Sequence, residues 1–207
     1  MHDYINAHAD DNGDSDDNKS QVSDNYDSNM LEEQDNLLTI IEGFGGDAAR
    51  LNWTPSAPSS AWEGVSFDRQ GCVRSLILTD HNPPLEVSEG VFPEALEFLS
   101  NVLFLDLSHN ELSGDLPREV CNLAHLQFLY LNNNALEGEL GPDIEKLASL
   151  KTLNLSGNQL TGQLEPSLSA LQELEILCLS NNSLEGTARL ECCFQCCIYT
   201  LHSLSIG

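Results

Sequence analysis

Basic side chains are scarce in this chain of 207 residues. Its 8 lysines and arginines stand against 33 aspartates and glutamates, which gives a formal charge of −25 at pH 7. A charge of this sign repels the phosphates of nucleic acids and the headgroups of anionic lipids. The composition therefore predicts that nucleic acid is not a partner.

Long apolar runs are missing as well. A membrane-spanning helix needs about 18 or more apolar residues in a row, and the sequence contains no such run. The segment from Met1 to Asp17 has neither the basic start nor the apolar stretch of a secretory signal peptide. We expect no membrane span in this chain. As it stands the sequence predicts a cytoplasmic protein; if the gene model is truncated, it predicts a secreted or membrane-attached one.

Signatures of catalysis are also absent from the sequence. The 6 histidines are dispersed, and none has a cysteine or carboxylate at metal-ligand spacing on a shared helix face. The glycine-rich loop and the catalytic-loop motif of kinases do not occur. We therefore expect no enzymatic activity, no catalytic residue, no metal site and no cofactor.

The 7 cysteines do not form the even set on which small secreted domains are built, so reduced thiols are the simpler interpretation. Four of them lie close together near the end of the chain, as Cys192, Cys193, Cys196 and Cys197. A four-cysteine zinc site normally consists of two separated pairs, which these are not. Zinc binding, acylation, a disulfide, a poorly packed tail and an error in the gene model all stay open for this segment.

The acidic residues are concentrated at the start of the chain. Residues 1–35 hold eleven acidic side chains and a single basic one, Lys19. Aspartate, asparagine and serine dominate there, and such a composition cannot bury enough apolar surface to offset the entropy lost on ordering. The sequence predicts a disordered acidic tail over residues 1–30.

A repeated pattern, LxxLxLxxNxLxG, occurs four times with a constant period of 24 residues. Its asparagine column is Asn110, Asn134, Asn158 and Asn182, and its glycine column is Gly114, Gly138, Gly162 and Gly186. A fifth, degenerate unit precedes these four. It has Val73, Leu76 and Leu78 in the strand positions and His81 in place of the asparagine, followed by an insertion over residues 81–92.

The spacing within each unit has a direct physical meaning. Leucines two residues apart on a short strand point to the same side, into a core, while the residue between them faces outward. The asparagine amide can satisfy backbone groups that would otherwise be buried without partners, so stacked copies form a structural ladder. One unit cannot cover its own leucines, so the units must stack. The sequence predicts an α/β-type solenoid, a leucine-rich-repeat horseshoe with short parallel strands on its concave face.

Apolar residues at helical spacing precede the first repeat, namely Leu37, Ile40, Ile41 and Phe44. Asp35 is the expected N-cap of this helix, and Gly45-Gly46 is its expected stop. We expect the helix to cap the core, with Trp53 and Trp62 packed beneath it. The predicted organisation is an N-terminal cap over residues 31–72, the repeats over 73–186 and a degenerate cysteine-rich tail over 187–207.

The segment LNWTPSAPSSAWEGVSFDRQGCVRSLIL resembles the N-terminal cap of plant-type leucine-rich-repeat proteins, whose W-x-G-V element is matched by Trp62, Gly64 and Val65. The unit ending NELSGDLPREVCNL resembles the plant-specific repeat. Such repeats are similar to those in the ectodomains of receptor-like kinases, receptor-like proteins and polygalacturonase-inhibiting proteins. The family cap often has cysteines around the W-x-G-V element, whereas this chain has Ser60 and Phe67, so that disulfide cannot form here.

The outward positions of the strands form the concave surface with which such solenoids usually bind partners. The expected ligand-binding residues are Phe104, Asp106, Phe128, Tyr130, Thr152, Asn154 and Ile176. The aromatic residues among them would form an exposed patch of the kind favoured at interfaces. The flanking positions, such as Ser108 and His109, are mostly small and polar and are interpreted as solvated filler.

The resulting functional hypothesis is a non-enzymatic module that binds a protein or peptide. The alternative is a fragment of a leucine-rich-repeat receptor-like kinase or receptor-like protein ectodomain that acts in signalling or defence. A glycosidase-inhibitor module is a third hypothesis, and it differs only in its target.

Overall fold

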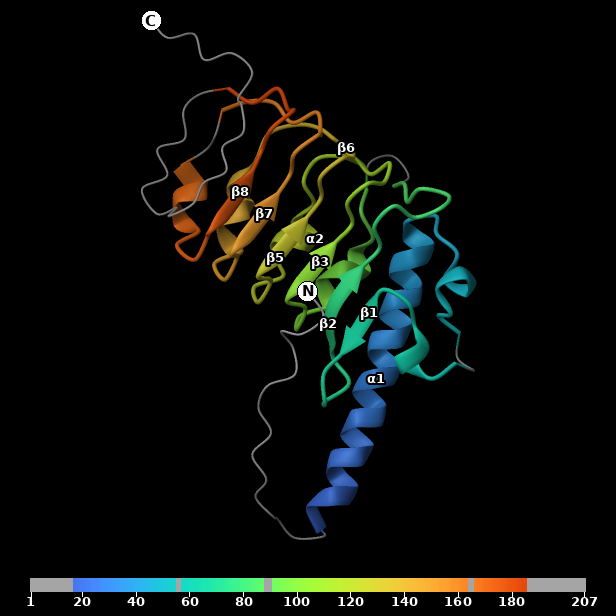
Figure 1. The fold of residues 1–207 in the computed structure, drawn as a ribbon. Helices are drawn as coiled ribbons and strands as arrows, with labels where there is room; N and C mark the ends of the chain where they lie inside the picture. The colour runs from blue at the N-terminus through green and yellow to red at the C-terminus, as the bar shows by residue number, and fades with distance from the viewer. Residues whose placement is uncertain (1–16, 55–56, 88–90, 164–165, 186–207) are drawn as a thin grey trace, which may run out of the picture.

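A six-stranded sheet forms one side of the protein in the computed structural model, which describes residues 17–54, 57–87, 91–163 and 166–185. The strands follow the order β1-β2-β3-β5-β7-β8 across the sheet (Figure 1). Their bounds are Val65–Phe67 for β1, Val73–Ile77 for β2, Phe104–Asp106 for β3, Phe128–Tyr130 for β5, Thr152–Asn154 for β7 and Ile176–Cys178 for β8. Neighbouring strands from β2 to β8 are parallel, and β1 joins β2 antiparallel at the edge. The predicted leucine-rich-repeat fold with short parallel strands is confirmed.

The pairing of the strands follows the period found in the sequence. From β3 to β8 each residue lies opposite the residue 24 positions later, as Leu105 lies opposite Leu129. The step from Leu76 in β2 to Leu105 is longer, 29 residues, because the first unit carries the insertion. That insertion also contributes to the core, since Leu85 and Phe92 are buried.

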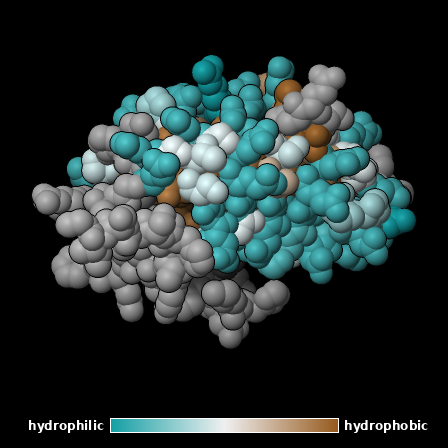
Figure 2. All heavy atoms as spheres, turned by 90° about the horizontal axis from the view of Figure 1, so that it is seen from above, coloured by the Kyte–Doolittle hydropathy of each residue, from teal (hydrophilic) through white to brown (hydrophobic). Residues whose placement is uncertain are grey.

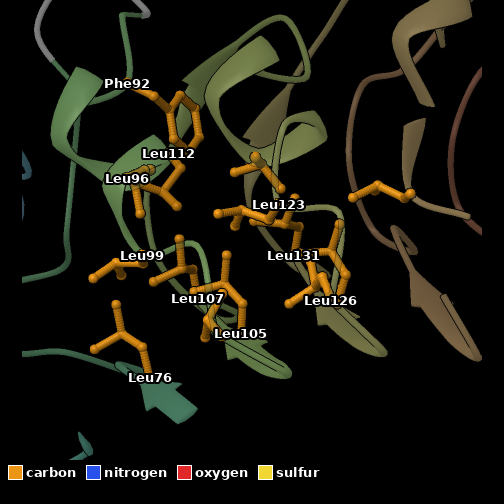
Figure 3. Packing of buried hydrophobic residues seen from close by; sticks show 14 of the residues in the cluster. Leu76, Phe92, Leu96, Leu99, Leu105, Leu107, Leu112, Leu123, Leu126 and Leu131 are labelled. Carbon is orange, nitrogen blue, oxygen red and sulfur yellow. The ribbon is translucent and has the colours of Figure 1, made fainter. Parts of the chain in front are cut away.

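A continuous core of leucine side chains fills the space between the sheet and the short helices that cover it. These helices are η4 (Glu94–Phe98), α2 (Arg118–Cys121), η5 (Pro142–Lys146) and η6 (Pro166–Ala170). Leu105 and Leu107 from the strand side and Leu123 from the helix side are fully buried and belong to one cluster (Figure 3). Burying each such leucine contributes about 1.5–3 kcal/mol. The stability of the array therefore depends on the stacking of neighbouring units.

The glycine column marks the turn that follows each strand. A second, two-stranded parallel sheet forms here from β4 (Ser113–Gly114) and β6 (Ala135–Leu136). The φ angles of Gly114, Gly138 and Gly162 are 84°, 75° and 79°, in the left-handed region that disfavours side chains. A Cβ on Gly138 would also lie 2.0 Å from Oδ1 of Asp115. Gly186 lies outside the described residues.

The chain before the first strand forms a long helix, α1 (Asp17–Gly43). Buried residues follow one face of it and continue past its end, namely Met30, Glu33, Leu37, Ile40, Ile41 and Phe44. Asp35 lies inside the helix, so its expected role as the N-cap is wrong. The buried face extends upstream through Glu33 to Met30. The apolar pattern of the sequence did not reveal this extension, because Glu33 is polar. The boundary expected at residue 30 thus falls within α1, and residues 1–16 lie outside the described part of the chain.

The expected helix stop at Gly45-Gly46 is confirmed. The amide of Gly45 donates to the carbonyl of Glu42 at 2.9 Å, and the amide of Gly46 donates to the carbonyl of Ile41 at 2.8 Å. Gly45 has a φ of 66°. These two bonds and the left-handed glycine form a Schellman motif, which satisfies the last carbonyls of the helix.

Two tryptophans pack between α1 and the first strands. The short helices η1 (Ala48–Leu51) and η2 (Ser59–Ala61) lead to them. Trp53 and Trp62 are stacked with ring centroids 5.6 Å apart, and both lie in the buried cluster that includes the apolar face of α1. Gly64 follows with a φ of 74°, and a Cβ there would lie 2.2 Å from the carbonyl oxygen of Ile77. The glycine of the W-x-G-V element is therefore required by the close approach of β1 and β2.

Glu33 is a carboxyl group within the buried face of α1. It is 7% exposed, and its Oε2 has no hydrogen-bond partner within the described residues. Burial raises the pKa of Glu33 to about 7; the charges of Glu32 and Asp68 act in the same direction, and a hydrogen bond with the backbone of Val73 acts against it. Ionisation of Glu33 therefore opposes the packing of α1 against β2.

The surface of the described residues is mainly hydrophilic when it is seen from above, and hydrophobic residues appear there only in small patches (Figure 2). Among the described residues, no helix has the length and apolar character needed to cross a membrane. The predicted cysteine-rich tail over residues 187–207, including Cys192, Cys193, Cys196 and Cys197, lies outside the described residues.

Candidate binding surface on the sheet

The asparagines of the repeat connect the backbones of neighbouring units. Asn158 donates from Nδ2 to the carbonyl oxygens of Leu131 and Leu155, both at 2.9 Å, and its Oδ1 accepts from the amide of Leu136 at 3.0 Å. Equivalent bonds are formed by Asn110, Asn134 and Asn182. Because each carboxamide bonds to two units, it fixes the position of one strand relative to the next.

Two columns of side chains cross the outer face of the sheet, in the positions that alternate with the buried leucines. The first column is Ser75, Phe104, Phe128, Thr152 and Ile176, and the second is Ile77, Asp106, Tyr130, Asn154 and Cys178. The seven residues expected from the sequence to contact a ligand therefore lie in two adjacent columns. Ile77 and Ile176 are the most exposed large apolar side chains among them, at 42% and 40%.

Three aromatic rings form a cluster on β3 and β5. The ring centroid of Phe104 lies 5.7 Å from that of Phe128 and 5.4 Å from that of Tyr130, with tilts of 34° and 35°. All three side chains are partly exposed. Tilted rings at these separations attract each other, which holds the cluster in one arrangement. We refer to these three residues as the aromatic cluster.

Thr152 does not present its side chain to solvent. It is only 5% exposed, and it forms a side-chain hydrogen bond with Tyr130. Burial raises the pKa of Tyr130, while this hydrogen bond acts in the opposite direction. Thr152 therefore positions the phenol of Tyr130. Its own side chain offers little accessible surface for the direct ligand contact expected from the sequence.

Asp106 and Asn154 occupy equivalent positions on β3 and β7 and form the same local bonds. Oδ1 of Asp106 accepts from the amide and the hydroxyl of Ser108, at 3.0 Å and 2.6 Å. Oδ1 of Asn154 accepts from the amide and the hydroxyl of Ser156, at 3.2 Å and 2.7 Å. Ser108 is 5% exposed, so its interpretation as solvated filler is wrong. These serines fix the orientation of the polar side chains on the sheet face.

The residue just before each ladder asparagine has a left-handed backbone. The φ angles are 59° at His109, 56° at Asn133, 68° at Gly157 and 56° at Asn181, and Asp80 in the first unit has 49°. Histidine, asparagine, aspartate and glycine are the residues that tolerate this region best. The interpretation of this column as filler overlooked a backbone constraint, which the recurrence of these residue types at one position could have revealed.

A pocket of about 520 Å³ lies elsewhere, lined in part by Val91, Leu116, Cys121 and Asp143. The Cys121 thiol is buried, and burial raises its pKa to about 12, so it is not ionised at neutral pH and is a poor nucleophile. Asp143 is engaged by Lys146, whose Nζ lies 2.7 Å from Oδ1. Among the described residues, no group of histidine, cysteine, aspartate and glutamate is arranged to hold a metal ion. The sheet face is thus the stronger candidate for a functional surface.

Models of leucine-rich repeats match residues 73–136 and 149–171 of the chain. Receptor-like protein 3 of Arabidopsis thaliana is 34% identical to the chain over 86 residues. This match covers 42% of the chain and 11% of the length of that protein. The chain thus corresponds to a small part of this relative.

Two similar solved structures also come from Arabidopsis thaliana. The BIR2 ectodomain is 33% identical, with a TM-score of 0.66 and coverage of 74% of this chain and 82% of that one. A match in the complex of BIR3 and SERK2 is 31% identical, with a TM-score of 0.60 and coverage of 72% and 83%. Together with the repeat and the parallel sheet, these matches show that the chain belongs to the plant-type leucine-rich-repeat proteins.

Proposed function

We propose that this protein is a non-enzymatic module that binds a protein or an extended peptide along the outer face of its sheet, as the concave face of a horseshoe-shaped solenoid. The proposed contact residues are Phe104, Asp106, Phe128, Tyr130, Asn154 and Ile176. The observation that supports the proposal is the aromatic cluster, three partly exposed rings on adjacent strands. Exposed aromatic side chains are typical of interface centres.

The aromatic cluster does not serve the core. Leu105 and Leu129 fill the core from β3 and β5, and the rings project from the other side of these strands. Other units carry Ser75 or Asn154 in the same columns, so the fold accommodates polar side chains there. Aromatic rings on rigid strands lose little entropy on binding and bring a large apolar area. A selective advantage in binding explains their position better than a requirement of folding.

The relatives support a role in recognition. One of the similar structures is a complex between two proteins, BIR3 and SERK2. The other similar structure, that of BIR2, is an ectodomain. We therefore keep a fragment of a receptor-like kinase or receptor-like protein ectodomain, acting in signalling or defence, as the second candidate function. In both cases residues 31–72 serve as the N-terminal helical cap, and residues 73–186 form the binding array.

The second candidate can be tested at the level of the gene. Sequencing of full-length transcripts is expected to reveal a signal peptide upstream, or a membrane span with or without a kinase downstream, if the chain is a receptor fragment. Transcripts that contain neither would rule out the receptor candidate and leave the binding module itself intact.

Binding by the sheet face can be tested without knowledge of the natural ligand. A library of random dodecapeptides is selected on the immobilised wild type and on the double variant Phe128→Ala/Tyr130→Ala. The control is Phe98→Ala, which removes an aromatic side chain that is 57% exposed on η4, away from the sheet face. We expect the selected peptides to bind the double variant at least about tenfold more weakly, since two aromatic contacts are lost, and to bind the control unchanged. Equal binding to all three proteins, or no enrichment of any peptide, would refute the proposal.

A further inference from the structure

An aspartate lies beside the aromatic cluster on the sheet face. Asp106 is opposite Tyr130 in the strand register, and Phe104 is two residues before it on the same face of β3. The negative charge of Asp106 acts on the Tyr130 hydroxyl, since it adds to the effect of burial in raising the pKa of that phenol. A carboxylate and three aromatic rings therefore share one small area of the sheet.

The carboxylate of Asp106 is held in position by hydrogen bonds, and no cationic side chain among the described residues pairs with it. Its Oδ1 accepts both hydrogen bonds from Ser108, and Asp106 forms no ion pair with any described residue. Arg74 of the neighbouring strand β2 is engaged elsewhere, since its Nε lies 3.3 Å from Oδ2 of Asp68 and its Nη1 donates to the carbonyl of Asn101. Lys151 immediately precedes β7, two strands further across the sheet.

We propose that Asp106, Phe104, Phe128 and Tyr130 form a subsite for the guanidinium or ammonium group of an arginine or lysine side chain of the bound peptide. This proposal rests on the binding function proposed above and defines the chemistry of the ligand. The faces of aromatic rings attract cations, and an adjacent carboxylate supplies the opposite charge. The formal charge of −25 also favours the approach of a basic partner over an acidic one.

The chain contains a matched control for the charge of this subsite. Asn154, two strands away, forms with Ser156 the same pair of bonds that Asp106 forms with Ser108. An asparagine at position 106 can therefore keep the local geometry, and Asp106→Asn is expected to fold as the wild type does. The double variant Asp106→Asn/Gln159→Asp preserves the net charge but moves the carboxylate to an exposed residue beyond β7, outside the two outer columns of the sheet.

The test uses random dodecapeptides selected separately on the wild type, on Asp106→Asn and on the double variant. Peptides selected on the wild type are expected to share an arginine or lysine that is absent from those selected on either variant. A selected arginine peptide is then compared with its citrulline analogue, which has the same shape and no charge. We expect the wild type to prefer the arginine peptide about tenfold, and we expect this preference to be reduced in both variants, in which only the aromatic rings attract the cation.

The outcomes separate this proposal from the binding function. Peptides that bind the wild type without a shared basic residue, or whose binding is unchanged in Asp106→Asn, would refute the cationic subsite and leave the binding function standing. A preference for arginine as large in the double variant as in the wild type would also refute it, because the net charge and not the subsite would then be responsible. If no peptide bound the wild type, both proposals would be wrong.

Discussion

The substitution Asn158→Ala tests how much the asparagine ladder contributes to the stability of the stacked units. Asn158 is 8% exposed and forms three hydrogen bonds to backbone groups. In Asn158→Ala the carbonyls of Leu131 and Leu155 keep a second amide donor, from Asn134 and Asn182 respectively. The amide of Leu136, in contrast, loses the acceptor that Asn158 provided.

The expected magnitude follows from these three bonds. A buried amide without an acceptor costs about 1–3 kcal/mol, and each of the other two bonds contributes about 0.5–1.5 kcal/mol. The free energy of unfolding should therefore fall by about 2–6 kcal/mol, a large fraction of the total stability of a typical domain. The matched control is Gln159→Ala, which removes the exposed side-chain amide of the next residue and should change the stability by less than about 0.5 kcal/mol.

Urea unfolding followed by far-UV circular dichroism measures both variants. With a slope of about 2 kcal/mol per molar urea, the midpoint of Asn158→Ala should be about 1–3 M below that of Gln159→Ala. The fluorescence of Trp53 and Trp62 reports on the N-terminal end in the same samples, so a shared midpoint indicates that the array unfolds as one unit. If the two variants unfolded at the same urea concentration, the ladder amides would not stabilise the stack.

Three further pairs of measurements test other parts of the fold. Glu33 has a folded-state pKa of about 7, above its ordinary value of 4.5. Its contribution to stability is therefore fully present below pH 4.5 and is lost as the pH rises through 7. Measured by urea unfolding, the advantage of Glu33→Gln over the wild type in free energy of unfolding should grow by about 1–3 kcal/mol from pH 5 to pH 8. Gly64→Ala should lower the thermal midpoint strongly because its Cβ would meet a backbone oxygen, whereas Gly141→Ala meets nothing within 4 Å and should be neutral; equal midpoints would contradict the close approach of β1 and β2. Leu131 is fully buried, and Leu131→Ala should lower the free energy of unfolding in urea by about 2–5 kcal/mol. Its control is Glu137→Ala, at an exposed position, which should lower that free energy by less than about 0.5 kcal/mol. An unchanged stability of Leu131→Ala would show that the unit does not depend on its buried leucine.

The parts of the fold that every unit repeats were predictable from the sequence. A strand leucine such as Leu129 must be buried in each unit, so its 24-residue recurrence gives the register between strands directly. The end of α1 was predictable for a local reason, since two consecutive glycines after an apolar helical stripe provide the left-handed cap. Both features depend on residues that lie close together in the chain or recur at a fixed distance.

The features that depend on contacts between units were not predictable in the same way. Thr152 occupies an outward position, yet Tyr130 of the preceding unit forms a hydrogen bond with it and it is buried. Glu33 lies on the buried face of α1 although its side chain is polar, because its surroundings come from β2 and the loop that contains Asp68. In each case the burial is decided by a neighbour that the periodicity does not identify.

The columns of the repeat differ in how strongly the fold constrains their residue types, and this difference supports the proposed binding surface. The leucine columns must be apolar, the ladder column must carry an amide, and the column of His109 and Asn133 must tolerate a left-handed backbone. The two outer columns face no such requirement, since they hold serine in one unit, phenylalanine in the next two and asparagine further on. Variation in unconstrained columns is the means by which a solenoid changes its ligand without changing its stability. The aromatic cluster and Asp106 lie in these columns on adjacent strands, where neither the core nor the asparagine ladder dictates the residue type, and this placement supports the proposed binding surface.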